Sequence, residues 1–165
     1  MNSLKVARMA LRAAARSHPV QRRGYADVAP DKLRLSLALP HQTIYKSQDV
    51  DSVQVNIAAE SGEMGILAQH VPSIEQLKPG LVEVIEETGG NKQFFLSGGF
   101  ATVQPGSVLS INAVEGYPLE DFSAENVRNQ ITEAQKIAAG SGSEQDKAEA
   151  NIELEVLESL QAALK

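Results

Sequence analysis

The histidines are the first residues to test for chemistry, because the chain contains no cysteine and only three histidines. His18 lies near the N-terminus, His41 follows a proline, and His70 precedes a Val-Pro step. None of them takes part in a His-x-x-x-His or Glu-x-x-His spacing, which would place two metal ligands on one helix face. The sequence therefore offers no recognisable zinc site, disulfide framework or thiol nucleophile.

Motifs for a nucleophilic serine or a bound phosphate are also missing from the sequence. No Gly-x-Ser-x-Gly elbow, Walker motif or Gly-x-Gly-x-x-Gly fingerprint occurs. The segment Ser97-Gly98-Gly99-Phe100 favours a strand-end bend that needs small residues. A dispersed Ser-His-Asp site stays open, because its members need not be adjacent in sequence. We expect no catalytic residue, no cofactor and no metal ion.

Two pairs of carboxylates could share a proton only if both members of a pair faced the same side. Glu86 and Glu87 are adjacent on a predicted strand, so their side chains point to opposite faces. Glu120 and Asp121 precede a predicted helix, where acidic residues favour the helix dipole. Neither pair indicates general acid–base catalysis.

Lys92 keeps one chemical alternative open. Its place at the tip of a predicted hairpin resembles the modified lysine of lipoyl and biotinyl carrier domains. Those carriers place the lysine beside Asp or Met, whereas Asn91 and Gln93 flank it here. The flanking residues favour a solvated lysine, and a lipoyl-type carrier modified on Lys92 is the alternative.

Residues 1–25 have the composition of a mitochondrial transit peptide. All six charged residues in this stretch are basic, and four of them recur at helical spacings of three and four. Arg23-Gly24-Tyr25-Ala26 is similar to a matrix-peptidase site, so we expect cleavage between Tyr25 and Ala26. A basic arm that binds acidic surfaces is the alternative.

Removal of this segment makes the chain strongly acidic. Six of the 15 basic residues leave with it, so nine basic residues face 21 acidic ones and the net charge is about −12. Such a domain is a poor fit to nucleic acid, whose phosphates need clustered Lys and Arg. The sequence also lacks a run of about 18 apolar residues, so we expect no membrane span.

The elements that position these residues fall into two classes, and the first consists of strands. Leu33, Leu35, Leu37 and Leu39 alternate with other residues, which is typical of a half-buried strand. Further strands are predicted at positions 53–57, 81–87, 93–96, 101–103 and 109–113. Turns are predicted at 88–91 and, with Pro-Gly in the centre of a type II turn, at 104–107. The pattern predicts an antiparallel β-sandwich over residues 26–118, in which Gly62–Gly80 is a shaped loop that presents a surface to other proteins.

The second class is helical and begins after Pro118. Ser123 and Ser143 are predicted N-caps, and Gly140-Ser141-Gly142 separates the two helices. The predicted apolar seam of the first helix is Ala124, Val127, Ile131, Ala134 and Ala138. That of the second is Ala148, Ile152, Val156, Leu160 and Ala163. An antiparallel helical hairpin over 119–165 follows, which gives an α+β fold class.

Several blocks of sequence, taken in this order, resemble the ATP synthase delta/epsilon family. They are Gly-Glu-Met-Gly-Ile-Leu (62–67), His-Val-Pro (70–72), Leu-Lys-Pro-Gly (77–80), Leu-Ser-Gly-Gly-Phe (96–100) and Val-Gln-Pro-Gly (103–106). The resemblance spans roughly residues 33 to 118. It implies a ten-stranded sandwich followed by a helical hairpin.

The resemblance also implies a function without catalysis. Members of this family sit in the rotating central stalk of a proton-driven ATP synthase, and the basic N-terminus implies the mitochondrial enzyme, on the matrix side of the inner membrane. The implied partners are the gamma subunit, the small mitochondrial epsilon subunit and the ring of c subunits. The family's c-ring-facing loop falls on Glu63, Met64, Gly65, Ile66 and His70. These residues also have structural alternatives, since Gly65 could serve only the turn, Ile66 could fill the core, and His70 could be a loop residue satisfied by backbone groups.

The C-terminal half departs from the bacterial members of the family. Those members bind ATP through an Asp-x-x-Arg-Ala segment, which the stretch from Asp121 to Arg128 does not match. The second predicted helix is acidic, so it would repel the acidic segment that an inhibitory hairpin contacts. We expect a permanently folded hairpin that neither senses ATP nor inhibits. A matrix adaptor without a rotary role is the remaining alternative.

Overall fold

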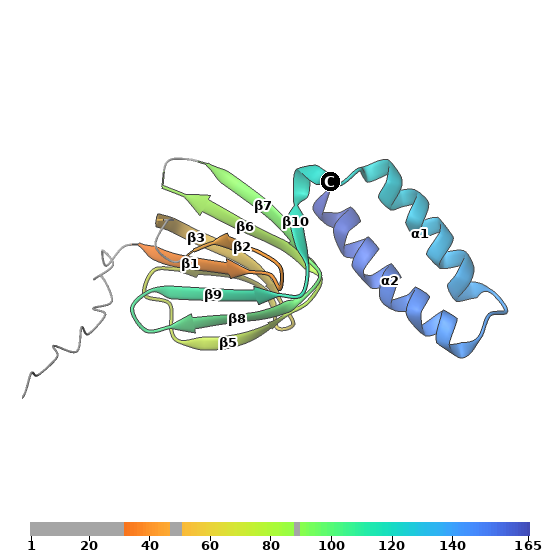
Figure 1. Ribbon diagram of the computed structural model, residues 1–165, viewed down its shortest axis with the longest axis horizontal. Helices are drawn as coiled ribbons and strands as arrows, with labels where there is room; N and C mark the ends of the chain where they lie inside the picture. The colour runs from red at the N-terminus through yellow and green to blue at the C-terminus, as the bar shows by residue number, and fades with distance from the viewer. Residues whose placement is uncertain (1–31, 47–50, 88–89) are drawn as a thin grey trace, which may run out of the picture.

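The computed structural model describes residues 32–46, 51–87 and 90–165. The expected transit peptide (1–25) and its cleavage candidates, Tyr25 and Ala26, lie outside the described residues. So do Thr88 and Gly89 of the expected turn. Figure 1 shows that the strands wrap around one core and that two long helices project from one end of it.

The described residues form ten strands, the number that the family resemblance implies. They are β1 (Leu33–Ala38), β2 (Thr43–Tyr45), β3 (Asp51–Ala59), β4 (Gly62–Leu67), β5 (Ser73–Leu77), β6 (Gly80–Glu86), β7 (Asn91–Leu96), β8 (Gly99–Gln104), β9 (Val108–Ala113) and β10 (Gly116–Pro118).

The sheet folds into a sandwich because β3 takes part in both layers. In one layer β3 is followed by β6, β7 and β10, and β4 pairs with the other side of β3. In the other layer the order is β5, β8, β9, β1 and β2, and β3 reaches this layer through β5 and β1. One pairing departs from the expected antiparallel pattern, since β1 runs parallel to β9 over Arg34–Ala38. The direction of β9 is set by its hairpin with β8, so β1 meets a strand that already runs the same way.

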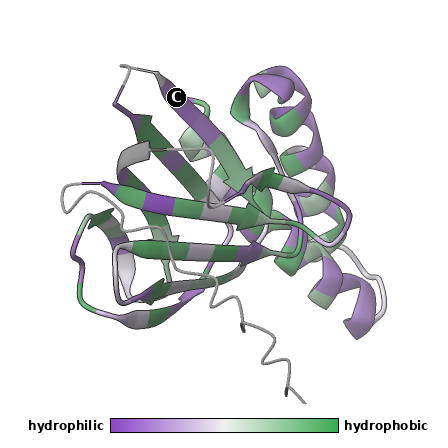
Figure 2. Ribbon diagram, turned by 60° about the vertical axis from the view of Figure 1, so that its left-hand side comes forward, coloured by the Kyte–Doolittle hydropathy of each residue, from purple (hydrophilic) through white to green (hydrophobic). Residues whose placement is uncertain are grey.

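The predicted alternation of apolar residues builds the core of the sandwich. Leu33, Leu35 and Leu37 on β1 are fully buried, as are Val55 on β3 and Leu109 on β9. Figure 2 shows the corresponding alternation of hydrophobic and hydrophilic residues along the strands. Because side chains of a strand alternate between its two faces, each of these strands contributes one apolar face.

The prediction that Gly62–Gly80 is a loop is wrong for most of its length. This segment contains all of β4 and β5, and only residues 68–72 and the turn before Gly80 lie outside strands. Met64 and Ile66 alternate with exposed residues on β4, but the glycines between and before them weaken the hydrophobic pattern. The short strands β2 and β10 were also missed, since three residues are too few to establish a period.

The helical hairpin follows the prediction closely. A short 3₁₀ turn, η1 (Leu119–Asp121), leads into α1 (Ala124–Ala139), and α2 (Glu144–Ala163) returns alongside it. Ser123 caps α1 by accepting a hydrogen bond from the Asn126 amide. Ser143 caps α2 with a complete capping box, in which Asp146 reaches back to the Ser143 amide.

The predicted seam is correct in the middle of the first helix, but Ala124 at its start is exposed and Ala138 is only half-buried. For the second helix it is partly wrong. Val127, Ile131 and Ala134 of α1 are buried as expected. On α2 the buried residues are Ala150, Leu157 and Leu160, whereas Ile152 is 65% exposed. The helix is rotated from the predicted orientation because Leu154, Leu157 and Leu164, at spacings of three and seven, pack against the sandwich and α1.

Candidate docking surface

The edge strand β4 carries four of the five residues that the family resemblance places against a partner. β4 pairs with β3 along all six of its residues, and no other strand among the described residues pairs with it. Its second edge therefore presents backbone N–H and C=O groups that are not used within the sheet. A strand of this kind is a natural place for a second protein to bind.

The side chains of β4 divide between the surface and the core. Glu63, Gly65 and Leu67 lie on the exposed side, and Leu67 is 50% exposed although it is apolar. Ile66 is fully buried, and Met64 packs against the same core from a half-buried position. The side chain of Ile66 thus fills the sandwich and is not available for contact.

Gly65 keeps the exposed side of β4 flat. A Cβ atom at this position would lie 3.2 Å from both Asn56 Oδ1 and Gln54 Nε2. These two amides on β3 are themselves joined by a 2.7 Å hydrogen bond from Gln54 Nε2 to Asn56 Oδ1. A side chain at residue 65 would press on this pair, so glycine here makes room for the β3 amides and does not serve a turn.

The segment after β4 is held in place by the turn between β8 and β9. Gln69 adopts a left-handed backbone with φ 62°, and its amide donates a 2.9 Å hydrogen bond to Ser107 Oγ. The His70 amide donates to the Leu67 carbonyl at 3.3 Å, and His70 Nδ1 lies 2.8 Å from the Val71 carbonyl. No pattern in the sequence predicts the Gln69–Ser107 contact, which joins residues 38 positions apart in the chain.

The structure places Glu63 and His70 at different ends of β4. Glu63 pairs with Ala58 near the start of the strand, whereas His70 follows its last residue. Since a strand rises about 3.3 Å per residue, Glu63 and Leu67 alone are about 13 Å apart. The expected contact residues therefore form a line along one edge and do not converge on a single point.

The lysine that suggested a carrier domain is held by its neighbours. Lys92 Nζ lies 2.8 Å from Glu86 Oε1 and 5.5 Å from the centroid of the Tyr45 ring. The Tyr45 hydroxyl donates to the same carboxylate oxygen at 3.2 Å. The bond to Glu86 raises the pKa of Lys92, which makes its amine a poorer nucleophile for acylation.

Glu86, the last residue of β6, and Glu87 just after it have separate partners, as the sequence predicts. Glu86 bonds with Lys92 and Tyr45, whereas Glu87 Oε2 lies 2.8 Å from Lys32 Nζ. In the described part of the chain, no group of three or more His, Asp or Glu residues could hold a metal ion.

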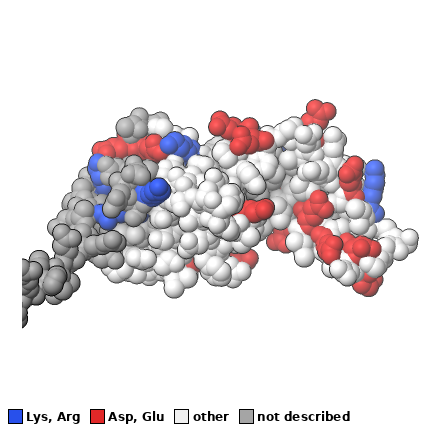
Figure 3. Space-filling view, in the orientation of Figure 1, with Lys and Arg blue, Asp and Glu red and all other residues white. Residues whose placement is uncertain are grey.

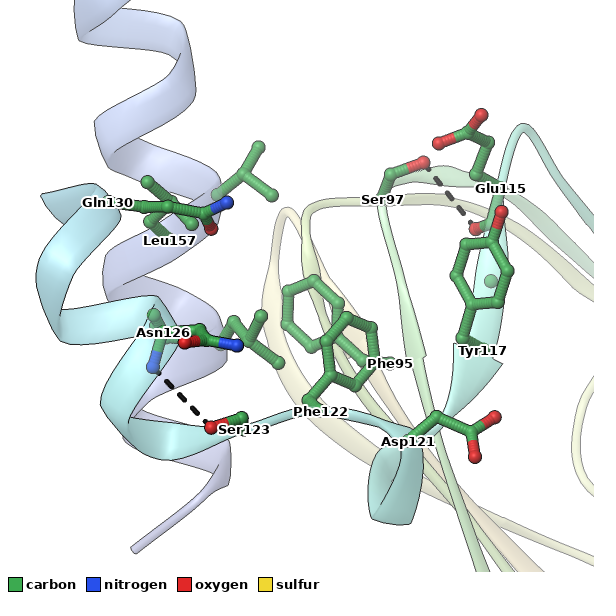
Figure 4. A pocket seen from close by; sticks show the side chains of 14 residues that line it. Phe95, Ser97, Glu115, Tyr117, Asp121, Phe122, Ser123, Asn126, Gln130 and Leu157 are labelled. Atoms are coloured by element: carbon green, nitrogen blue, oxygen red, sulfur yellow. Dashed lines mark hydrogen bonds between the residues drawn. The ribbon is translucent and has the colours of Figure 1, made fainter. Parts of the chain in front are cut away.

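A groove of about 400 Å³ separates the helical hairpin from the sandwich, and sequence reasoning missed it (Figure 4). Phe122 lies at its base and makes edge-to-face contacts with Phe95 at 5.9 Å and with Tyr117 at 6.2 Å between ring centroids. Phe95 belongs to β7 but is buried among helical residues. One signal was present, because Phe94-Phe95-Leu96 is an unbroken apolar run, which indicates a strand covered on both faces.

The polar groups of the groove do not form a catalytic arrangement. The Ser97 hydroxyl donates to the Glu115 carbonyl at 3.4 Å, and Ser123 Oγ serves the α1 cap (Figure 4). The charged residues that line the groove are Glu115 and Asp121, both of them acidic. The groove therefore suits an uncharged or basic side chain and disfavours a nucleotide phosphate.

Comparison with known proteins places these features in one family. The family model described as "ATP synthase, Delta/Epsilon chain, beta-sandwich domain" matches residues 32–114. The model described as "Fungal epsilon subunit of F1F0-ATP synthase C-terminal domain" matches residues 122–162. The two matches divide the chain into the same strand-rich and helical parts that the structure shows.

The matching relatives extend over nearly the whole chain. The mitochondrial ATP synthase subunit delta of Neurospora crassa is 75% identical over 167 residues, covering 100% of both chains. That of Saccharomyces cerevisiae is 51% identical over 148 residues, covering 88% of this chain and 90% of its own.

In the described part of the chain, no helix is long and apolar enough to cross a membrane. Solved structures agree with the sequence matches. A chain of the Euglena gracilis mitochondrial ATP synthase (OSCP/F1/c-ring) superposes with a TM-score of 0.77 at 35% identity, covering 86% of this chain and 87% of that one. A chain of the Tetrahymena thermophila central stalk/c-ring, at 16% identity and a TM-score of 0.56, shares the fold. The chain therefore belongs to the ATP synthase delta/epsilon family and groups with its mitochondrial delta subunits.

Proposed function

We propose that this chain works in the central stalk of a mitochondrial ATP synthase, where it transmits rotation of the c-ring to the gamma subunit. The observation that carries this proposal is the 75% identity to the Neurospora crassa delta subunit over the full length of both chains. The chain is a non-catalytic subunit of the complex, so its contribution is mechanical. Its sandwich, with ten strands around one core, has the rigidity that transmission of torque needs.

The β4 edge is the surface we assign to the c-ring. Glu63 and Gly65 on the strand and His70 beyond it offer a charged, a flat and a hydrogen-bonding position along one line. Met64 and Ile66 support the same surface from inside, because they anchor β4 to the core. The gamma subunit and the small epsilon subunit are the other proposed partners.

We assign the interdomain groove no role in nucleotide binding. Its charged residues, Glu115 and Asp121, would repel a triphosphate, and none of the residues that line it is basic. The complete caps and the buried Phe95 contact favour a hairpin that stays folded against the sandwich. This chain would therefore lack the ATP sensing of its bacterial relatives.

Further proposals concern the segment limits and the location of the protein. We propose a transit peptide over 1–25 that is cleaved between Tyr25 and Ala26, a sandwich domain over 26–118 and a hairpin domain over 119–165. We also propose a peripheral position on the matrix side of the inner membrane. The mitochondrial relatives and the basic N-terminal segment support the transit peptide and the matrix-side position.

Co-purification tests the proposed function against the matrix-adaptor and carrier alternatives. The chain would be tagged at its C-terminus, isolated from detergent-solubilised mitochondria, and analysed by native mass spectrometry. We expect one copy in a complex with gamma and the c-ring, and an intact mass without an adduct on Lys92. Recovery of the chain free of other ATP synthase subunits would contradict the rotor role.

A further inference from the structure

Two residues of the sandwich hold a left-handed backbone conformation although neither is glycine. Gln69, in the loop between β4 and β5, has a φ of 62°, and Ser107, in the turn between β8 and β9, has a φ of 58°. In the described ranges 32–46, 51–87 and 90–165, no other residue except glycine has a positive φ. This conformation is unfavourable for a residue that carries a Cβ atom, so the surrounding structure must hold both residues in it.

The two strained residues are bonded to each other. The Gln69 amide donates a 2.9 Å hydrogen bond to Ser107 Oγ, and this bond is called the clasp below. Ser107 is only 7% exposed, whereas Gln69 lies on the surface. The Ser107 carbonyl in turn accepts a 2.8 Å hydrogen bond from the Arg34 amide at the start of β1. A buried serine that is anchored to β1 thus fixes the backbone of an exposed loop.

The clasp acts on the turn that carries His70. The His70 amide donates to the Leu67 carbonyl at 3.3 Å, so residues 67–70 form a turn with Gln69 at its third position. A positive φ at this position of a turn is usual for glycine or asparagine and not for glutamine. The 3.3 Å bond is longer than a typical N–H···O hydrogen bond, so it closes the turn only weakly. The clasp, at 2.9 Å, is the better-formed restraint on the orientation of His70.

The clasp lies at the end of the sandwich opposite the helical hairpin. Figure 1 shows the β8–β9 turn and the first residues of β1 at this end. Figure 3 shows Lys and Arg side chains interspersed with acidic ones at this end, whereas acidic side chains predominate over the hairpin. The clasped end therefore presents no field of a single sign to a partner, so the shape and position of the loop count for more there than net charge.

A loop that only connected β4 to β5 would not need two strained residues. Glycine at positions 69 and 107 would adopt the same φ without a steric penalty. Strain of this kind persists where the surrounding structure fixes a functional geometry, as it does at ligand clamps. A surface loop that is already ordered also loses less conformational entropy when it binds a partner than a mobile loop does. The clasp thus gives the His70 loop the order that a docking element needs.

We propose that Ser107 is a positioning residue for contact with the c-ring, because the clasp orders the His70 end of the β4 edge before the partner binds. This inference rests on the proposed function, in which the β4 edge meets the c-ring. Ser107 is buried, so it acts through Gln69 and is not itself a contact residue. Loss of its hydroxyl should weaken binding of the c-ring without unfolding the chain.

The test compares three substitutions of Ser107 in the complete stalk. Ser107→Gly and Ser107→Ala both remove the hydroxyl, and glycine in addition relieves the backbone strain. Ser107→Asn returns an oxygen acceptor on a residue that tolerates the left-handed conformation. Ser141→Ala, which removes an exposed hydroxyl between the two helices, is the control.

Two measurements report on each variant. The catalytic sector with its complete stalk, purified from mitochondria in which the variant is the sole copy, is titrated onto immobilised c-rings to give a Kd. Hydrogen exchange of residues 68–72 is measured on the isolated chain, together with its thermal unfolding. A role of Ser107 in stability alone would lower the unfolding temperature without changing the Kd.

We expect Ser107→Gly and Ser107→Ala to weaken c-ring binding about three- to tenfold and to speed exchange at residues 68–72 by a similar factor. Ser107→Asn and Ser141→Ala should stay within about twofold of the unmodified chain. Unchanged binding in both hydroxyl-free variants would overturn the inference, as would an equal loss in Ser107→Asn or the unfolding of both hydroxyl-free variants. Binding of the c-ring that is equally tight when this chain is absent from the stalk would instead contradict the proposed function itself.

Discussion

The hydroxyl of Ser159 on α2 donates a 2.6 Å hydrogen bond to the carbonyl oxygen of Pro79, which lies in the turn before β6. The two residues are 80 positions apart in the chain, and the bond joins the hairpin to the sandwich. Gly80, next to Pro79, is buried, and a Cβ there would lie 2.5 Å from Ala58 Cβ. The close packing at this turn leaves the carbonyl within reach of α2.

Loss of this hydrogen bond should loosen the hairpin. We expect Ser159→Ala to lower the free energy of unfolding by about 0.5–1.5 kcal/mol, because the half-buried Pro79 carbonyl loses its donor. The substitution should also increase the rate of hydrogen exchange more in α2 than in the sandwich core. The control Ser141→Ala removes an exposed hydroxyl between the helices and should change stability by less than about 0.5 kcal/mol. Equal stability of the two variants would show that the Ser159 bond does not hold the hairpin.

The sequence was sufficient for features that depend on local pattern and insufficient for those that depend on distant contacts. The alternation of leucines on β1 and the caps Ser123 and Ser143 are local, and the structure confirms them. The Ser159–Pro79 bond joins segments 80 residues apart, and no periodicity reports such a contact. The exposed position of Ile152 was missed because contacts with the sandwich, and not helix pattern alone, set the rotation of α2.

The candidate docking surface was predictable in part. The family motif identified Glu63, Gly65 and His70 by resemblance, but a motif does not state that they lie along an edge strand. That arrangement follows from the pairing of β4 with β3, which glycines in the segment obscured in the sequence. The exposure of Ile74, Phe100 and Val114 was not predictable either, since these residues come from three separate segments.

Glu83 on β6 should make stability depend on acidic pH. Its carboxylate accepts hydrogen bonds from Asn91 at 2.8 Å, Gln93 at 3.1 Å and Asn56 at 2.8 Å. These bonds, that of Asn91 first, lower the pKa of Glu83 in the folded protein below its ordinary value of 4.5. The unfolded chain then binds the proton more readily, so this contribution is complete above pH 4.5 and is lost as pH falls through the lower folded value.

The Glu83→Gln variant should therefore lose less stability than the unmodified chain between about pH 5 and pH 3. Urea unfolding at a series of pH values measures this difference. The acid loss should be reduced rather than abolished, because the bond with Lys92 also lowers the pKa of Glu86. Parallel pH profiles for the two proteins would show that the amide network does not favour the charged form of Glu83.

The interdomain groove should not bind ATP. Glu115 and Asp121 at its walls would repel the phosphates, and the segment from Asp121 to Arg128 does not match the bacterial ATP motif. Isothermal titration of ATP with Mg²⁺ into the purified chain should give no binding heat at millimolar concentrations. A saturable one-to-one binding isotherm would contradict this prediction. It would show that the chain shares the ATP binding that we assign only to bacterial relatives.

Charge reversal on the β4 edge should affect the complex and not the fold. Glu63 is exposed, so we expect Glu63→Lys to change the free energy of unfolding of the isolated chain by less than about 0.5 kcal/mol. Proton-driven ATP synthesis or the yield of assembled complex should fall severalfold. Glu133→Lys, on the exposed side of α1, is the control for a general effect of charge. Normal synthesis and normal yield in the Glu63→Lys complex would remove Glu63 from the proposed contact.

Disulfide cross-linking tests the rotor role most directly, because the chain has no cysteine of its own. Glu63→Cys would be introduced into the intact complex together with a single cysteine on the face of the c-ring that meets the stalk, and the complex would be oxidised. If this chain and the c-ring turn together, the cross-link should form in high yield while ATP hydrolysis and coupled proton pumping remain near their uncross-linked rates. A cross-link that stops hydrolysis until it is reduced, or no cross-link from either Glu63→Cys or His70→Cys, would contradict the account.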